Sequence, residues 1–368
     1  MDTKVIAITE QASRGTGQSH FHIAIARIPD LHTTALYYER AAICAGYEVT
    51  ILSDVAMLYQ LPPVDLLLVI DPFFGGIQFL PELNFPTALV LIDTHRDLVT
   101  RAMYSRFFDH VFVAQQSDVS RIIGDGHPSV HWLPLGGDSK VHFVPDLARD
   151  IDLGFVGSLG APGSERNTVL TTILNRFLTN EIGPFYSPTE MGEIYSRSKI
   201  VFNKSIGGDV NMRVFEALAS GALLVTDRIG NGLKDLATEG VHYVGYDSVE
   251  EAIAEIERYL ADHKARTQIA EAGQALLLER HTYDARLSQI LDTVLKSHHR
   301  SFAPARQVSR GQRRLWQASW ARRRGITLPA AAGLLSEGLA ISGYVDLAVG
   351  LARGVSRWLQ QLGHRFRG

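Results

Sequence analysis

Short apolar runs alternate with longer segments of helical periodicity through the first 296 residues of this chain. Strands that alternate with helices are typical of α/β proteins with parallel sheets. In the first part of this stretch, the runs predict a helix over Thr33–Ala45 and buried strands at Val5–Ile8, Tyr47–Leu52, Leu66–Ile70, Thr87–Ile92, Val111–Ala114 and Val130–Leu133. In the second part, they predict helices near 164–178, 189–197, 210–219 and 249–262, and strands at Leu153–Val156, Ile182–Tyr186, Lys199–Asn203, Leu223–Thr226 and His242–Val244.

Turn-forming residues separate the two parts between His131 and Asp138, where a proline and two glycines follow the last apolar run. We therefore expect a Rossmann-like domain over residues 1–135, a second over 136–296, and a basic helical tail over 297–368. Two doubly wound domains that face one another leave a cleft at the carboxyl ends of their strands, where open α/β sheets bind ligands. The predicted fold class is α/β.

The composition is that of an ordinary globular protein, with 368 residues of which 46% are hydrophobic and 20% charged. Cys44 is the single cysteine, so no disulfide can form within the chain, and a reducing compartment is expected. Neither a signal peptide nor an apolar stretch long enough to cross a bilayer is apparent. We expect a cytoplasmic protein.

The tail has the opposite charge to the body. Residues 297–368 contain twelve Arg, no Lys and two acids, a balance of +10, and the overall charge of −3 leaves −13 for residues 1–296. Such a tail could lie on the inner face of a membrane, mediate self-association or bind an acidic partner protein. Alternatively, the helices expected beyond Pro329 pack back on the acidic body or on a second subunit. Nucleic acid is not an expected partner, because only the tail could contact phosphates.

The most informative segment runs from Asp209 to Asp227. It predicts a glycine-bearing loop, a helix that stops at Gly221, and a buried strand, which is an arrangement suited to binding phosphate. Glu216 is the one acid among the apolar residues of this helix. A carboxylate in such surroundings needs a partner, which could be a ribose diol, a nearby Arg or a helix amide.

Four segments together resemble the nucleotide-binding half of GT-B glycosyltransferases, and most closely the spore-maturation (CgeB-like) group within the glycosyl transferases group 1 family. They are LGFVGS at 153–158, SKIVFN at 198–203, DVNMRVFEALASGALLVTD at 209–227 and RHTYDAR at 280–286. The resemblance covers residues 130–295 well and the first half loosely. It implies a GT-B fold, a nucleotide-sugar donor and no requirement for a bound metal.

The resemblance also implies roles for residues of the second half. Glu216 corresponds to the carboxylate that holds the ribose hydroxyls, while Asp209, Asn211 and Arg213 fall where the group contacts the diphosphate or donor sugar. Arg166 matches an arginine often present in the group, and a pyrophosphate clamp or a solvated side chain would both fit it. Asn203 and Lys204 end a strand at the cleft, where Lys204 could neutralise a leaving nucleoside diphosphate. The amides of Gly157 and Ser158 could approach a phosphate.

One departure from the family pattern concerns the donor sugar. The better-known retaining GT-B families pair two glutamates eight positions apart, but Gly208 stands eight residues before Glu216. Asp209 is its neighbour, yet a shorter acid one position away will not place its oxygens identically. The sequence therefore leaves the donor sugar and the stereochemistry open.

The first domain is expected to bind the acceptor. Asp93 and His95 follow a predicted strand, and either could take a proton from an acceptor hydroxyl in an inverting reaction; His95 could instead only hydrogen-bond substrate or a loop. No third ligand supports a metal site here. Further acceptor-side candidates are a glycine-bearing loop with Arg14, Gly15 and Gly17, and the aromatic residues Phe73 and Phe74, which could also be core residues.

We therefore predict a hexosyltransferase-type enzyme that moves a sugar from a UDP- or GDP-linked donor to a hydroxyl of an unidentified glycan, protein or small molecule. The alternative is a catalytically degenerate GT-B scaffold that acts through its Arg-rich tail, an interpretation favoured by the missing glutamate at Gly208.

Overall fold

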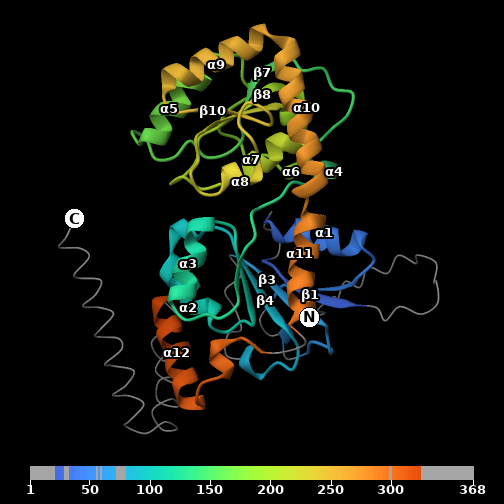
Figure 1. The fold of residues 1–368 in the computed structure, drawn as a ribbon, viewed down its shortest axis with the longest axis vertical. Helices are drawn as coiled ribbons and strands as arrows, with labels where there is room; N and C mark the ends of the chain where they lie inside the picture. Colours follow the sequence, from blue (N-terminus) through green and yellow to red (C-terminus); the bar gives the residue numbers. More distant parts are fainter. Residues whose placement is uncertain are drawn as a thin grey trace, which may run out of the picture.

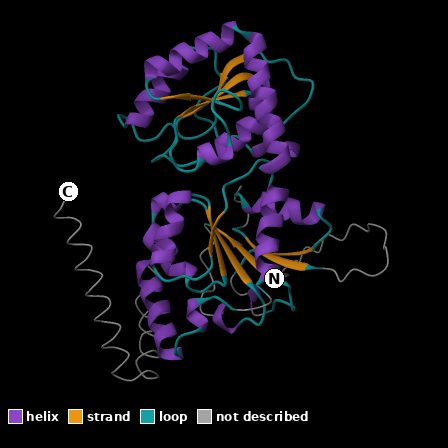
Figure 2. Ribbon diagram, in the orientation of Figure 1, coloured by secondary structure: helices purple, strands orange, loops and turns teal. Residues whose placement is uncertain are grey.

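The computed structural model describes residues 21–28, 33–54, 57–58, 60–71, 80–297 and 301–324. Two parallel sheets form the described part of the chain, six-stranded in the order β2-β1-β3-β4-β5-β6 and four-stranded in the order β10-β9-β8-β7. The domains built on them lie one above the other along the long axis of the molecule (Figure 1). In each, helices flank the strands (Figure 2). The structure confirms the predicted α/β class.

The first sheet has a fully buried centre. β3 (Leu66–Ile70) and β4 (Thr87–Leu91) are apolar apart from Thr87 and have every residue buried, as expected for parallel strands covered on both faces. Its other elements are β1 (His22–Ala26), α1 (Ala35–Cys44), β2 (Glu48–Leu52), the 3-10 turns η2 (Leu80–Glu82) and η3 (Thr94–Arg96), α2 (Leu98–Ser105), β5 (His110–Val113), α3 (Gln116–Gly124) and β6 (Val130–Trp132).

The second sheet is smaller and carries more helices. Helix α6 (Pro188–Arg197) begins with a capping box between Ser187 and Glu190 and has Pro188 at its first position, which fixes its start. The remaining elements are α4 (Ser139–His142), β7 (Ile151–Gly154), α5 (Glu165–Leu174), β8 (Ser198–Asn203), α7 (Met212–Ala219), β9 (Leu223–Asp227), α8 (Leu233–Leu236), β10 (Val244–Tyr246), α9 (Val249–Ala261) and α10 (His263–Arg280).

The chain then returns to the first domain. Tyr283, Leu287 and Ile290 of α11 (Tyr283–Lys296) are buried in one cluster with Tyr38 and Ala42 of α1. Helix α11, orange in Figure 1, lies beside α1, which is blue. The end of the segment that we predicted as the second domain, 136–296, thus contributes to the core of the first.

Residues 301–324 also pack on the first domain. Helix α12 (Arg310–Arg323) lies against α2 and buries Trp320 and Ala321 in the core beside Tyr104. The segment before it includes the turn η4 (Pro304–Arg306). This stretch, for which we expected a membrane or an acidic partner, therefore contacts the body of the protein. The alternative of packing back on the body concerned the helices beyond Pro329 and stays a prediction. Residues 325–368, the rest of the predicted tail, lie outside the described residues.

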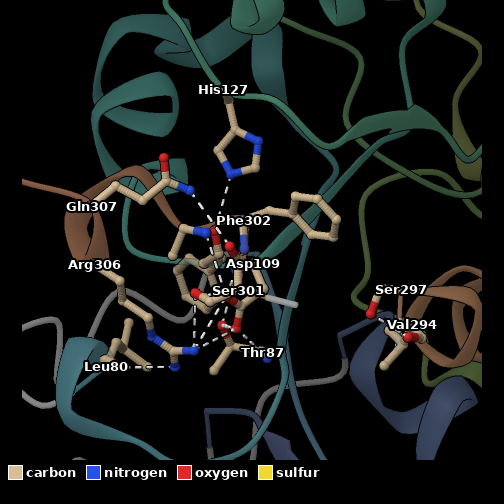
Figure 3. Close-up of polar contacts among 12 residues, drawn as sticks. Leu80, Thr87, Asp109, His127, Val294, Ser297, Ser301, Phe302, Arg306 and Gln307 are labelled. Carbon is tan, nitrogen blue, oxygen red and sulfur yellow. Dashed lines mark hydrogen bonds and ion pairs between the residues drawn. The ribbon is translucent and has the colours of Figure 1, made fainter. Parts of the chain in front are cut away.

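A single buried carboxylate, Asp109, anchors the start of this segment at the amino end of β5. It accepts hydrogen bonds from the Ser301 hydroxyl at 2.6 Å, the Phe302 and Ala303 amides at 3.2 and 3.3 Å, and the Arg306 guanidinium at 3.1 Å. The amide and hydroxyl of Thr87 donate to it as well (Figure 3). Asp109 therefore joins the sheet to the chain that leaves α11.

Two strand predictions differ from the structure. β1 was not predicted, although it pairs with both β2 and β3, and the predicted strand Val5–Ile8 lies outside the described residues. The predicted strand Ile182–Tyr186 is wrong, because these residues form a bent loop before α6. Gly183 adopts a φ of +119°, a conformation that interrupts an extended strand, and Pro184 follows it.

Candidate active site

A cleft of about 400 Å³ lies between the two domains. The first domain contributes the start of α1 and the carboxyl ends of β3 and β4, and the second contributes the loop before α6, the start of α6 and helix α7. Its described lining contains three carboxylates and no Lys or Arg: Thr33, Thr34, Tyr37, Asp71, Ile92, Asp93, Phe185, Tyr186, Pro188, Met191, Met212 and Glu216.

Glu216 is the most unusual group in this cleft. It lies on the second turn of α7 and is 8% exposed, yet its carboxylate has no hydrogen-bond partner among the described residues. Burial raises its pKa to about 7, because the charged form loses hydration, and the nearby charge of Arg213 only partly opposes this. Glu216 is thus a buried carboxylate that lacks the donors such a group normally has.

Arg213 does not pair with Glu216, because its guanidinium is occupied elsewhere. It donates to the Tyr195 hydroxyl at 3.2 Å, the Asn203 side chain at 2.9 Å and the Val156 carbonyl at 2.6 Å. A Cβ atom at Gly157 would lie 2.5 Å from Arg213 Nη2, so the close approach and the φ of +135° both require glycine there. Arg213, predicted on the donor side, holds the ends of β7 and β8 together.

Asn203 links the same strands from the buried end of β8. Its side-chain oxygen accepts from Arg213 and, at 3.0 Å, from Asn211, while its amide donates to Thr226 at 2.9 Å. Asn211 precedes α7, and its own side-chain oxygen is buried with no hydrogen-bond partner in the described part of the chain. These two predicted residues are therefore adjacent, and Asn203 is mainly engaged within the protein.

Two further predicted cations lie between the loops that follow β7 and β8. Lys204 Nζ is 3.2 Å from Glu165 and 3.3 Å from Asp227; burial opposes its charge, but the carboxylates outweigh burial and raise its pKa. Arg166 donates to the carbonyls of Ser158 and Lys204. Burial, with the charge of Arg213, lowers the pKa of Arg166 to about 10. The structure brings these cations together with Gly157 and Ser158.

His95 and Asp209 meet across the domain boundary. His95 Nδ1 contacts the Asp209 carboxylate, which lies in the loop before α7. Burial raises the pKa of Asp209, although His95 partly counteracts that effect. Asp93 lines the cleft, whereas His95 is not part of the described lining; the Asp93 side chain is 43% exposed and 3.2 Å from Arg96. The sequence assigned His95 and Asp209 to different ligands and did not predict their contact.

A buried ion pair supports the loop that carries His95. Asp71, at the end of β3, accepts from Arg101 at 2.6 and 3.0 Å, and from the amides of Ile92 and Asp93 at 3.4 and 3.3 Å. Sequence reasoning missed this role. The sequence feature that could have indicated it is an acid, Asp71, placed directly after a continuous apolar strand.

Gln115 is another residue that the sequence did not single out. Its side-chain amide accepts from the Val210 amide at 3.1 Å and donates to the Val210 carbonyl at 3.4 Å, so the first domain holds the loop before α7. Asn231 donates to the same side chain at 3.0 Å.

The remaining acceptor-side candidates, Arg14, Gly15, Gly17, Phe73 and Phe74, lie outside the described residues. In the described part of the chain, no cluster of three or more His, Cys, Asp or Glu is arranged to hold a metal ion. None of its helices is both long and apolar enough to cross a membrane.

Comparison with known proteins agrees with this architecture. Residues 143–292 match the glycosyl transferase-like family. No curated protein matches the chain. HepE of Anabaena in complex with UDP and glucose superposes with a TM-score of 0.54 at 13% identity, covering 75% of this chain and 100% of that one.

Two other solved structures are similar over the same extent. Sucrose-phosphate synthase from Thermosynechococcus elongatus gives a TM-score of 0.53 at 12% identity, covering 76% of this chain and 99% of that one. A glycosyltransferase from Rickettsia africae gives 0.54 at 9% identity, with the same coverage. Residues 143–292 thus match the glycosyl transferase-like family, and the two domains together have the GT-B fold of glycosyltransferases.

Proposed function

We propose that this protein transfers a sugar, of hexosyl type, from a nucleoside diphosphate donor to an acceptor hydroxyl. The observation that carries the proposal is Glu216, a buried carboxylate without a hydrogen-bond partner among the described residues, which lines the cleft between two Rossmann-like domains. A ribose diol offers two O–H donors and would supply the missing hydrogen bonds. Membership of the CgeB-like group stays a prediction.

The diphosphate would lie at the amino end of α7, where helix amides favour negative charge. The preceding loop contains Gly207 and Gly208, both with positive φ, so it presents backbone amides rather than side chains. Lys204 is near this loop and would exchange one carboxylate contact for the leaving diphosphate. Arg166 would orient the loops that follow β7 and β8.

On the acceptor side, we propose His95 as the base of an inverting displacement. Its Nδ1 is engaged by Asp209, which leaves Nε2 for the acceptor hydroxyl. His95 would take the hydroxyl proton, the acceptor oxygen would attack the anomeric carbon, and the bond to the diphosphate oxygen would break. Asp209 would stabilise the imidazolium that forms, as a carboxylate does behind a catalytic histidine. Asp93 is the weaker choice, because it faces Arg96.

UDP is the first donor nucleotide to test, because the similar HepE structures contain UDP or UDP-glucose; GDP is the second. The degenerate-scaffold alternative gains no support from residues 301–324. Their Arg306, Arg313 and Arg323 pair with Asp109, Glu82 and Asp97 of the first domain.

A thermal-shift panel of UDP, GDP, CDP, ADP and TDP, with and without magnesium, tests the proposal. We expect one nucleotide to stabilise the wild type and not Glu216→Ala, while Glu271→Ala, an exposed glutamate of α10, keeps the full shift. A nucleotide that stabilises all three proteins equally would remove Glu216 from the site. No shift with any nucleotide would contradict the donor assignment.

A further inference from the structure

Tyr37 lies on the opposite wall of the cleft from Glu216. It belongs to the first turn of α1 in the first domain, is 7% exposed, and lines the same cleft. The two helices meet at their starts, where the Thr34 hydroxyl is 3.7 Å from the Met212 sulfur. Tyr37 is three residues beyond Thr34, and Glu216 is four beyond Met212, so each side chain lies one turn further along its own helix.

The Tyr37 ring is held in place from two sides. It stacks on Tyr283 of α11, with ring centroids 4.9 Å apart and planes 12° apart. Its hydroxyl oxygen is 3.0 Å from His142 Nε2. The phenol therefore has a fixed position in the lining of the cleft, supported by residues on both sides of the crossover between the domains.

The contacts of His142 decide which partner of that hydrogen bond donates. The Asp138 amide donates to His142 Nδ1 at 3.2 Å, so Nδ1 is an acceptor and carries no proton. Burial lowers the pKa of His142 to about 4, which keeps the ring neutral near pH 7. A neutral imidazole with an accepting Nδ1 has its hydrogen on Nε2. The Tyr37 oxygen therefore accepts, and its own hydrogen has no acceptor among the described residues.

We propose that Tyr37 binds the ribose of the donor nucleotide from the first domain, by donating its hydroxyl hydrogen to the diol that Glu216 engages from the second. This inference rests on the proposed function. A ribose hydroxyl can donate to the Glu216 carboxylate and accept from Tyr37 at once. Because the two groups belong to different domains, one diol would join both walls of the cleft. His142 is the positioning residue that leaves the Tyr37 hydrogen available.

Calorimetric titration with UDP and with 2′,3′-dideoxy-UDP tests this contact; GDP and its dideoxy analogue replace them if only GDP binds the wild type. We expect Tyr37→Phe to weaken UDP binding about tenfold, the effect of one lost hydrogen bond of about 1.4 kcal/mol. Binding of the dideoxy analogue, which lacks the diol, should be unchanged. If Tyr37 had a purely structural role, Tyr37→Phe would weaken the binding of both ligands equally.

Tyr38→Phe is the matched control, because Tyr38 is the next residue of α1, is buried, and contacts Tyr283 without lining the cleft. It should bind UDP like the wild type. If Glu216→Ala loses UDP binding but Tyr37→Phe binds UDP as tightly as the wild type, the inference about Tyr37 is wrong and the proposed function stands. If the wild type binds no nucleoside diphosphate, both are wrong.

Discussion

Asp109 and Glu216 are both buried carboxylates, but they differ in the number of hydrogen-bond donors that surround them. Asp109, at the amino end of β5, is surrounded by donors from Thr87, Ser301, Phe302, Ala303 and Arg306. Glu216, in the cleft, has no donor among the described residues, and burial raises its pKa to about 7. A carboxylate saturated by its own chain stabilises a fold, whereas one left unsatisfied in a cleft is suited to a ligand.

The largest effect is expected at the saturated site. Asp109→Ala leaves the half-buried Arg306 without its carboxylate and removes the acceptor for the segment before α12. We expect a loss of about 3–5 kcal/mol in the free energy of unfolding, the usual cost of breaking a buried ion pair from one side. Urea unfolding measures it, with the exposed Asp284→Ala as a control. A loss below about 1 kcal/mol would mean that the anchor contributes little.

Substitution of Glu216, the carboxylate in the cleft, should raise the free energy of unfolding at neutral pH rather than lower it. Because the pKa of Glu216 rises from 4.5 to about 7 on folding, the native state binds the proton more tightly, and the wild type loses stability as pH rises through 7. Glu216→Gln has no such titration. Its stability relative to the wild type should grow between pH 4.5 and 8 by on the order of 3 kcal/mol. A pH-independent difference would contradict the elevated pKa.

Buried histidines provide a pH dependence of opposite sign. Burial lowers the pKa of His110 to about 4, so its neutral form is favoured in the folded state and its contribution to stability is lost as pH falls from 6.5 towards 4. His110→Gln should flatten the acid side of the stability profile of the wild type by on the order of 1–3 kcal/mol. Equal acid slopes for both proteins would show that His110 is not responsible.

The smallest expected effect tests whether the remaining hydrogen-bond donors to Asp109 compensate for the loss of one. Ser301→Ala removes one hydroxyl donor at 2.6 Å and leaves the others. We expect a loss of about 1 kcal/mol in the free energy of unfolding, the net value of one hydrogen bond. A loss as large as that of Asp109→Ala would show that Ser301 is the main anchor rather than one of several donors.

The apolar pattern predicted most strands, because β3 is apolar throughout and β4, β5 and β8 have apolar, buried centres. It failed for Ile182–Tyr186, where the apolar residues flank Gly183 and Pro184 and belong to a loop at the cleft. The likeness of residues 209–227 to a known family pointed to Glu216.

The sequence could not predict contacts between residues distant along the chain. His95 and Asp209 meet only because the two domains face one another. Arg213 was predicted to contact the ligand, but in the folded protein it donates hydrogen bonds to Val156 and Asn203. Tertiary packing, which the sequence does not show, brings these residues to it. Tyr37 gave no sequence signal at all, since the role that we propose for it depends on His142 and on a helix from the other domain.

The central claim, that Glu216 binds the ribose of a nucleoside diphosphate, predicts a proton release. Near pH 6.5 much of Glu216 is protonated, and a diol that donates to the charged form should displace that proton. UDP binding measured by calorimetry in buffers of different ionisation enthalpy counts the protons released. We expect the wild type to release more protons than Glu216→Gln and to bind UDP more tightly. Equal proton release and equal affinity in the two proteins would contradict it.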